Sequence, residues 1–168
     1  VNLTEETSVL PTVAQSGHQS GSCVKIDVTT AEAAFTGSEY FSFRHYITGT
    51  DYQYLHGQEC TLVFWIRSGI AGQASVSFSN AAGNRQYIAP YTISSADTWE
   101  KKTITLTMDT SGTWLFTEAD RGLAIRFNFA SGPDRNTGTN NQWNGDALFS
   151  AANDVNLVSD ATKDIYIS

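Results

Sequence analysis

Gly122-Leu123-Ala124-Ile125-Arg126-Phe127-Asn128-Phe129 is an alternating run of the kind that forms a β-strand with one buried face. Successive residues of a strand point to opposite faces of its sheet. One face would therefore carry Leu123, Ile125, Phe127 and Phe129, and the other Ala124, Arg126 and Asn128. The run predicts a strand that lies between an apolar core and a polar surface.

A long polar loop follows this strand. Residues 130–146 have the sequence ASGPDRNTGTNNQWNGD, which is rich in amides and glycines and contains one large aromatic side chain, Trp143. A rigid strand that leads into such a loop commonly presents a binding surface. Sugars offer C–H faces that stack on aromatic rings and hydroxyls that hydrogen-bond to polar side chains, so Trp143 is a candidate carbohydrate-binding residue. It is equally well interpreted as a tryptophan that folds back to anchor the loop.

Four strand residues are candidates for the same surface, because the alternation predicts that they face outward: Arg126, Asn128, Arg85 and Tyr87. Their side chains would hydrogen-bond to sugar hydroxyls or to acidic groups. Taken singly, each is better explained by structural salt bridges or by protection of a sheet edge.

Strand-like runs recur along the chain, and helical periodicity is nearly absent. The predicted strands cover residues 24–28, 40–47, 60–67, 74–79, 85–93, 99–108, 123–129, 155–158 and 164–167. The run Cys60–Arg67 is apolar on both faces and is predicted to be a central strand covered on both sides. Pro90 predicts that its strand lies at an edge or contains a bulge. Residues 80–84 are predicted to form a hairpin turn with a glycine at positive φ.

This succession predicts an all-β fold, a two-sheet antiparallel β-sandwich. A jelly roll is the first expectation and an immunoglobulin-like sandwich the second. The 168 residues suit a single domain, 1–168, with an irregular start over 1–20. Val1 in place of methionine is expected of a processed chain or of a domain excised from a longer protein. Of the four tryptophans, Trp65 is predicted in the core, Trp99 at the sandwich edge and Trp114 at a core end.

Charge and composition weigh against several classes of function. The formal net charge is −7, and an acidic surface repels nucleic-acid backbones and anionic membranes, so neither is an expected partner. No apolar run approaches the ~20 residues of a membrane span.

Catalysis finds no support in the motifs. The three histidines are scattered, and no nucleophile or zinc-protease pattern appears, so we expect no enzyme activity and no cofactor. Structural calcium bound by loop carboxylates is left open, with unnamed ligands. A disulfide between Cys23 and Cys60 is geometrically conceivable, but two buried thiols are favoured.

Several strands together resemble the jelly-roll carbohydrate-binding modules found in phage tail-fibre and virion proteins. The run Thr61–Ser68, TLVFWIRS, is similar to their T-L-S-F-W strand, and Trp99–Thr103 is similar to their W-x-K-x-T strand. Gly122–Phe127 and Ile165–Ile167 are similar to two later strands, so the resemblance spans most of residues 20–168. It implies a jelly roll and glycan binding. It supplies no catalytic residues, and no matched motif specifies sugar contacts.

The expected function is therefore a non-catalytic carbohydrate-binding domain of a tail-fibre or virion protein that recognises a polysaccharide or cell-surface glycan. The expected location is virion or extracellular, with a homotrimer or a parent fibre or enzyme as partner. A structural virion or fibre module without ligand is the first alternative. An accessory binding module of a polysaccharide-degrading enzyme is the second.

Overall fold

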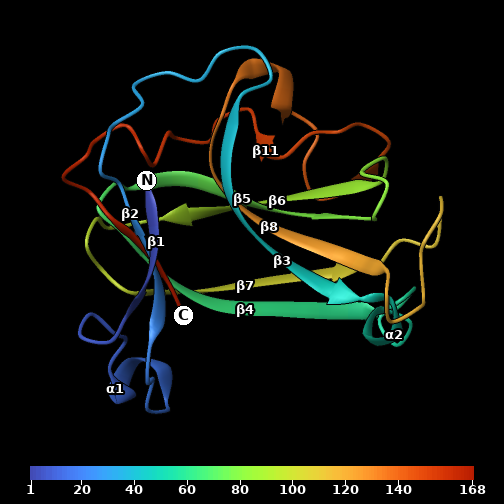
Figure 1. Ribbon diagram of the computed structural model, residues 1–168, viewed down its shortest axis with the longest axis horizontal. Coiled ribbons are helices and arrows are strands. Elements are labelled where there is room, and N and C mark those ends of the chain that lie inside the picture. The colour runs from blue at the N-terminus through green and yellow to red at the C-terminus, as the bar shows by residue number, and fades with distance from the viewer.

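The computed structural model describes all residues, Val1–Ser168, and contains two antiparallel sheets packed face to face (Figure 1). Sheet A has the order β1 (Asn2–Glu6), β2 (Cys23–Asp27), β12 (Ile165–Ile167), β4 (Glu59–Ser68) and β7 (Glu100–Thr107). Sheet B has the order β10 (Trp143–Asn144), β6 (Gln86–Ile93), β5 (Gly72–Ser79), β8 (Arg121–Ser131) and β3 (Tyr40–Thr48). A small parallel pair consists of β9 (Asn136–Thr137) and β11 (Ser150–Ala151). The helical turns are α1 (Val13–Ser16), α2 (Gly49–Tyr52) and the 3-10 turn η1 (Pro133–Arg135).

The connections between the long strands confirm the predicted β-sandwich. Strands β2 to β8 and β12 alternate between the two sheets along the chain, except at the β5–β6 hairpin. These eight strands have the orders β2-β12-β4-β7 and β3-β8-β5-β6. Two four-stranded sheets joined in this way form a jelly roll. No helix of the protein has both the length and the apolar character that a membrane crossing requires.

The core between the sheets follows the alternation seen in the sequence. Leu123, Ile125, Phe127 and Phe129 of β8 are all buried in it. Phe127 meets Phe64 of β4 edge-on, with 5.0 Å between ring centroids, so the two sheets contact through aromatic side chains. Trp114 closes one end of the core by stacking on Tyr52, as its sequence context predicts. Each fully buried large apolar side chain contributes about 1.5–3 kcal/mol.

The prediction that β4 is covered on both sides is wrong. Its residues alternate between the core and a partly open face, where Val63 is 48% exposed and Trp65 is only half-buried. Trp65 therefore lies outside the main core. It packs against the small cluster Cys23, Trp99 and Tyr166, which confirms Trp99 as a packing residue.

The start of the chain supplies part of the cover that this outer face needs. Val9 and Leu10 pack against the small cluster around Trp65, and residues 2–6 form the edge strand β1 paired with β2. An apolar strand can thus be covered by a short segment on one side instead of by a second sheet. The expectation of an irregular start over residues 1–20 is wrong for β1.

Of the other local predictions, some are confirmed and one is wrong. Asn80–Asn84 forms the predicted turn, with Gly83 at φ +69°. Pro90 lies where β6 is an edge, since β10 pairs only with Gln86 and Tyr87. Residues 155–158 form no strand. Leu157 and Val158 nevertheless fill the core, because apolar burial does not require ladder pairing.

Both thiols are free, and the prediction that both are buried holds for Cys23 but not for Cys60, which is only partly buried. Cys23 belongs to the outer cluster on sheet A, whereas Cys60 packs against the main core on the opposite face of that sheet. Burial raises the pKa of both thiols, which lowers their reactivity at neutral pH.

Candidate functional site

The segment after β8 covers part of the outer face of sheet B. It is drawn in orange to red in Figure 1 and lies above β5 and β8. Ala151 N of β11 donates to Ser75 Oγ at 3.2 Å, and Ser150 Oγ hydrogen-bonds to Ser131 Oγ. Leu157 N donates to the carbonyl oxygen of Phe129 at 2.8 Å. The sequence predicted a free polar loop, but much of this segment is a fixed cover.

A pocket of about 240 Å³ occupies the uncovered half of the same face, near the β5–β6 turn. Its floor follows one row of cross-strand neighbours, Tyr46, Ala124, Ser79 and Gln86, on β3, β8, β5 and β6. Alanine and serine in the middle of the row leave the hollow, because their side chains are short. The pocket is also lined by Arg44, Arg121 and Arg126, and we call it the arginine pocket.

These three arginines have no acidic partner. None of them takes part in any of the six ion pairs of the protein, and no aspartate or glutamate lines the pocket. By contrast, Arg67 and Arg85 pair with Asp97 and Asp109. A chain of net charge −7 thus gathers unpaired positive charge at one place on its surface. Such a local field attracts anions.

Arg126 is the most constrained of the three, with only 8% of its surface exposed. Its guanidinium lies 3.8 Å from the centre of the Phe149 ring, and its Nη1 donates to Ser42 Oγ at 3.4 Å. Burial lowers the pKa of Arg126, and the nearby charge of Arg44 lowers it further. Burying a charge without an opposite charge costs free energy, which cation–π contact offsets only in part.

Gln86 forms the opposite side of the floor and is 1% exposed. Its Nε2 donates to the carbonyl oxygen of Gly83 at 3.2 Å, which fixes the orientation of the amide. Its Oε1 receives no hydrogen bond. Buried polar atoms are normally paired, so this acceptor requires an explanation.

The rim beside Gln86 is held in shape by Asn80. Asn80 Oδ1 accepts hydrogen bonds from the backbone amides of Asn84 and Arg85, and its Nδ2 donates to Thr113 O at 3.0 Å. These bonds join the β5–β6 turn to the loop after β7. The pocket is therefore preformed on the Gln86 side.

The two exposed arginines, Arg44 and Arg121, lie beside Tyr46 at the outer end of the floor. Arg121 Nη1 lies 3.4 Å from the Tyr46 hydroxyl, and its guanidinium is 5.2 Å from the ring centre. Arg44 lies 5.7 Å from the same ring. Tyr46 remains exposed, so an aromatic surface and two guanidinium groups are available at the entrance.

Of the residues predicted from sequence, Arg126 lies in this pocket. Asn128 faces the same way two residues later on β8, as the alternation predicted. It is 1% exposed, and both ends of its amide lack a hydrogen-bond partner. Asn128 is therefore enclosed beside the pocket rather than part of its surface.

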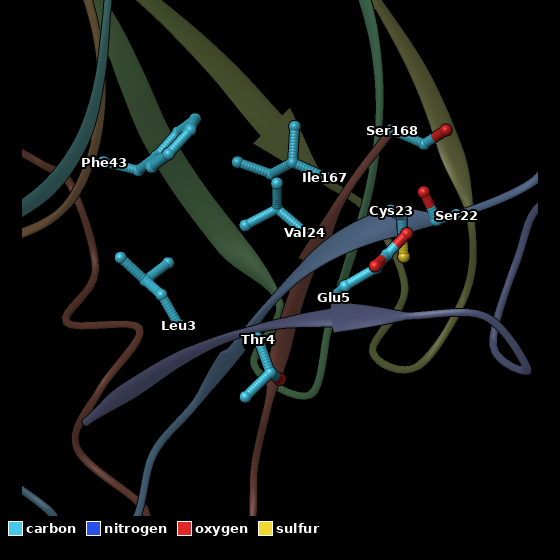
Figure 2. Close-up of a pocket in the computed structure, with 9 residues that line it drawn as sticks. All are labelled: Leu3, Thr4, Glu5, Ser22, Cys23, Val24, Phe43, Ile167 and Ser168. Atoms are coloured by element: carbon cyan, nitrogen blue, oxygen red, sulfur yellow. The ribbon is translucent and has the colours of Figure 1, made fainter.

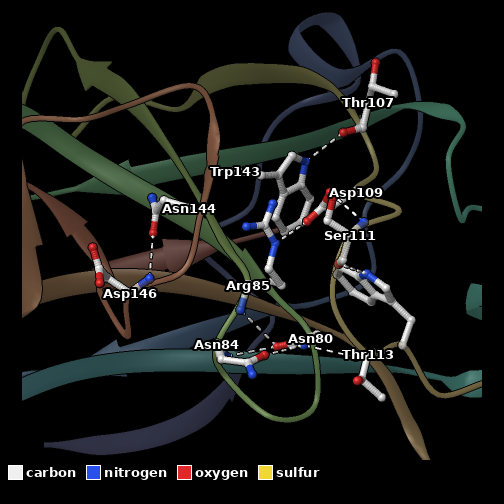
Figure 3. A network of polar contacts seen from close by, with 11 residues as sticks. Asn80, Asn84, Arg85, Thr107, Asp109, Ser111, Thr113, Trp143, Asn144 and Asp146 are labelled. Carbon is white, nitrogen blue, oxygen red and sulfur yellow. Dashed lines mark hydrogen bonds and ion pairs between the residues drawn. The ribbon is translucent and has the colours of Figure 1, made fainter.

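Arg85 and Trp143 lie elsewhere, at the edge where sheet B meets the loop after β7 (Figure 3), and the Tyr87 ring packs beside that of Trp143. The prediction that Arg85 and Tyr87 face outward is wrong. Tyr87 pairs across strands with core residue Phe78 and packs against the main core, and Arg85 pairs with Asp109. The predicted strand began one residue too early, since β6 starts at Gln86.

Trp143 makes the contacts of a loop anchor. Its Nε1 donates to Thr107 O of β7 at 2.8 Å, and its ring lies 5.7 Å from that of Trp114 and 5.6 Å from that of Tyr87. β10 thereby connects sheet B to sheet A at the open edge. Stacking of its remaining exposed surface on a sugar stays a prediction.

Sequence reasoning missed Arg44, Tyr46, Gln86 and Phe149 as pocket residues. The alternation of residues 40–47 places Arg44 and Tyr46 on the polar face of their strand. It does not reveal that this strand neighbours β8 with Arg44 opposite Arg126. Phe149 carried no signal, because its place depends on how the long loop folds.

Two further hollows are mainly apolar. The larger, about 540 Å³, opens beside β1, where Leu3, Val24, Phe43 and Ile167 point toward a common space (Figure 2). A smaller one of about 200 Å³ lies between the sheets and is lined almost wholly by core side chains. Binding sites usually combine apolar walls with a few convergent polar groups. The arginine pocket has such groups and is the candidate site.

No three histidine, cysteine, aspartate or glutamate side chains are grouped so as to hold a metal ion. The structure therefore names no ligands for a structural calcium ion. The sequence matches no protein-family model and no curated protein. The class of protein is defined by its fold, a jelly-roll β-sandwich with a preformed, positively charged pocket on one outer face.

Proposed function

We propose that this protein is a non-catalytic carbohydrate-binding domain of a tail fibre or another virion protein, and that it binds surface glycans in the arginine pocket. One observation carries the proposal. The pocket combines, on rigid strands, guanidinium donors, the amide of Gln86 and the exposed ring of Tyr46. Sugars present hydroxyls to such donors and acceptors and C–H faces to aromatic rings.

The size of the pocket supports a small polar ligand. Its volume of about 240 Å³ is below the ~300–1,000 Å³ of pockets that enclose drug-sized molecules. One sugar unit at the end or side of a longer glycan suits this volume. Affinity at one such site would be weak, and several copies in a fibre would raise it through effective concentration.

The jelly-roll strand order agrees with the resemblance to carbohydrate-binding modules. A fold by itself does not specify a ligand, so the proposal depends on the pocket and not on the fold. An accessory module of a polysaccharide-degrading enzyme would use the same chemistry. The other domains of the parent protein would separate these two contexts.

A structural fibre module is the second candidate, and the hollow beside β1 favours it (Figure 2). Leu3 is 58% exposed there and faces apolar neighbours. A neighbouring subunit could cover this surface. In that case the domain would bind no glycan.

A glycan array tests the proposal with the wild-type domain and with Ala124→Leu. Ala124 lies in the pocket floor, so the longer side chain would fill the hollow. The control is Thr103→Leu, which places a leucine on the exposed outer face of sheet A. We expect wild type and control to bind the same glycans and Ala124→Leu to lose them.

Trp143→Ala distinguishes the two sites that sequence and geometry suggest. Glycan binding that is unchanged in Ala124→Leu but lost in folded Trp143→Ala would transfer the site to Trp143. Absence of binding to every glycan would contradict the proposal and favour the structural module.

A further inference from the structure

We propose that the sugar unit bound in the arginine pocket is acidic, with a carboxylate placed against Arg126 and Arg44. This inference rests on the proposed function and adds the chemical class of the ligand. The groups that carry it are a pair of facing arginines, a buried guanidinium and a buried amide oxygen without a donor.

Like charges face each other in the arginine pocket. Arg44 and Arg126 are direct cross-strand partners on β3 and β8. Like charges directly opposite each other destabilise a sheet. Arg121 adds a third positive charge to the same pocket, and no carboxylate of the protein compensates any of them. An anion bound among the three guanidinium groups would remove this repulsion.

Aromatic rings around Arg126 fix the position of its guanidinium group. Two guanidinium groups contact the Phe149 ring, with Arg126 at 3.8 Å and Arg135 at 5.1 Å from its centre. The edge of Tyr40 contacts the same ring, with centroids 4.7 Å apart. Arg126 is therefore held in one place before any ligand arrives. A fixed planar guanidinium loses little entropy on binding and matches the two oxygens of a carboxylate.

The amide of Gln86 lies on the other side of the pocket from the arginines. Gln86 Oε1 lacks a donor, while the three arginines lack a negatively charged partner. A neutral sugar could donate a hydroxyl toward Gln86 but would leave the positive charges unbalanced. A simple inorganic anion could balance the charges but would offer little to the amide oxygen. An acidic sugar carries both groups on one ring.

Two other anions are less well suited. Nucleic acid would bring many phosphates toward a protein of net charge −7, which would repel them outside the arginine pocket. A sulfated sugar shares the chemistry of the carboxylate, since arginine binds either group. The experiment therefore includes a sulfated arm.

The test uses polysaccharides that contain uronic or sialic acids, printed beside the same polymers after their carboxyl groups have been reduced to alcohols. Sulfated neutral polysaccharides form the third arm. We expect binding to the acidic polymers, with a loss of roughly tenfold or more on carboxyl reduction, because hydrogen bonds to charged groups are worth ~1.5–3 kcal/mol. Binding should weaken as salt is added.

Arg44→Gln provides the matched variant, since Arg44 is exposed and its loss does not open the core. The control is Lys101→Gln, which removes one exposed charge from sheet A. We expect Arg44→Gln to weaken acidic-glycan binding by roughly tenfold and the control to leave it unchanged. Arg126→Lys keeps the charge but loses the planar fork, and should weaken binding as well.

The outcomes separate the inference from the proposed function. Equal binding of native and carboxyl-reduced polymers would overturn the acidic ligand and leave glycan binding intact. Preference for the sulfated arm would overturn the carboxylate. No binding in any arm would overturn both proposals.

Discussion

Arg44 and Arg126 face each other across β3 and β8 on the outer face of sheet B, and neither is paired with a carboxylate. Strands β8 and β5 hold the buried Arg126, with Ser77 as its neighbour on the other side. The arrangement maintains a positive charge on a rigid surface at the expense of stability. Functional sites commonly keep such unfavourable arrangements, because the ligand relieves them.

Replacing Arg44 should stabilise the free domain. Arg44→Gln removes the like-charge repulsion with Arg126, which is worth ~0.2–1 kcal/mol for a cross-strand pair. Urea unfolding at low ionic strength would measure the gain, and added salt should shrink it. The same loss of charge in Lys101→Gln should give no comparable gain. A domain destabilised by Arg44→Gln would show that Arg44 already has a stabilising partner.

Phe149 should be needed both for the cover and for the position of Arg126. Phe149→Ala removes a buried ring in contact with Arg126, Arg135 and Tyr40, and should cost about 3 kcal/mol or somewhat less. Phe149→Leu keeps much of the apolar volume but removes the cation–π contacts, and should cost less. Hydrogen exchange of the amide of Ala151 would report whether the cover opens. Unchanged exchange in Phe149→Ala would contradict this role.

Gly122 should tolerate no side chain. A Cβ there would lie 2.4 Å from Cβ of Tyr52 and 2.8 Å from Thr48 O, so α2 would have to move away from β8. We expect Gly122→Ala to destabilise by ~1–3 kcal/mol in thermal or urea unfolding. Gly138→Ala is the control, because its Cβ would meet nothing within 4 Å. Equal stability of the two variants would refute the close packing of α2 on β8.

Trp143 should contribute to stability through two separable contacts. Trp143→Phe keeps an aromatic ring against Trp114 and loses the hydrogen bond to Thr107 O, at a cost of about 1 kcal/mol. Trp143→Ala also loses the ring packing and should cost about 2–3 kcal/mol, less than a fully buried tryptophan. Denaturant unfolding of both variants would compare them. If neither changes stability, Trp143 does not anchor the loop.

The ion pair between Arg85 and Asp109 should make stability sensitive to acid. Partial burial alone would raise the pKa of Asp109, but hydrogen bonds from Arg85 and the amide of Ser111 hold that pKa below its usual value. A lowered folded-state pKa gives stability that is present above the unfolded value of about 3.9 and is lost as the pH falls toward the folded value. Asp109→Asn should therefore be less stable at pH 7 and lose less stability below about pH 4. Parallel pH profiles for the two proteins would contradict this assignment.

Side-chain alternation by itself predicts most of the strands. The period of two in residues 122–129 and 40–47 predicts strands with one apolar face, and β8 and β3 turn their apolar residues toward the core. The prediction of a polar surface on the other face of β8 is wrong, because that face is buried as well. Gly83 at positive φ and the edge position of Pro90 follow from the backbone limits of glycine and proline alone. The apolar run around Trp65 led to the wrong prediction that β4 is covered on both sides, because side-chain alternation does not say what covers each face.

The candidate site depended on the tertiary structure. Arg126 could be assigned to a polar face from its own strand, but its meeting with Arg44 depends on the pairing of β3 with β8, about 80 residues apart in sequence. The sequence predicts Trp143 as a binding residue because its neighbours are polar. It predicts Tyr87 as one because strand alternation assigns it to an outward face. Only the folding of the loop after β8 turned Trp143 toward Thr107, and only strand register turned Tyr87 toward Phe78.

The sequence by itself determined that this chain forms strands with apolar and polar faces, since that pattern is local and has a fixed period. Strand order, register and the path of the loop decided which polar residues come together and which are buried. These features depend on contacts between residues far apart in the sequence. The contacts come from the packing of the two sheets and from the covering segment, which Phe149 holds over Arg126. The arginine pocket exists only at that level.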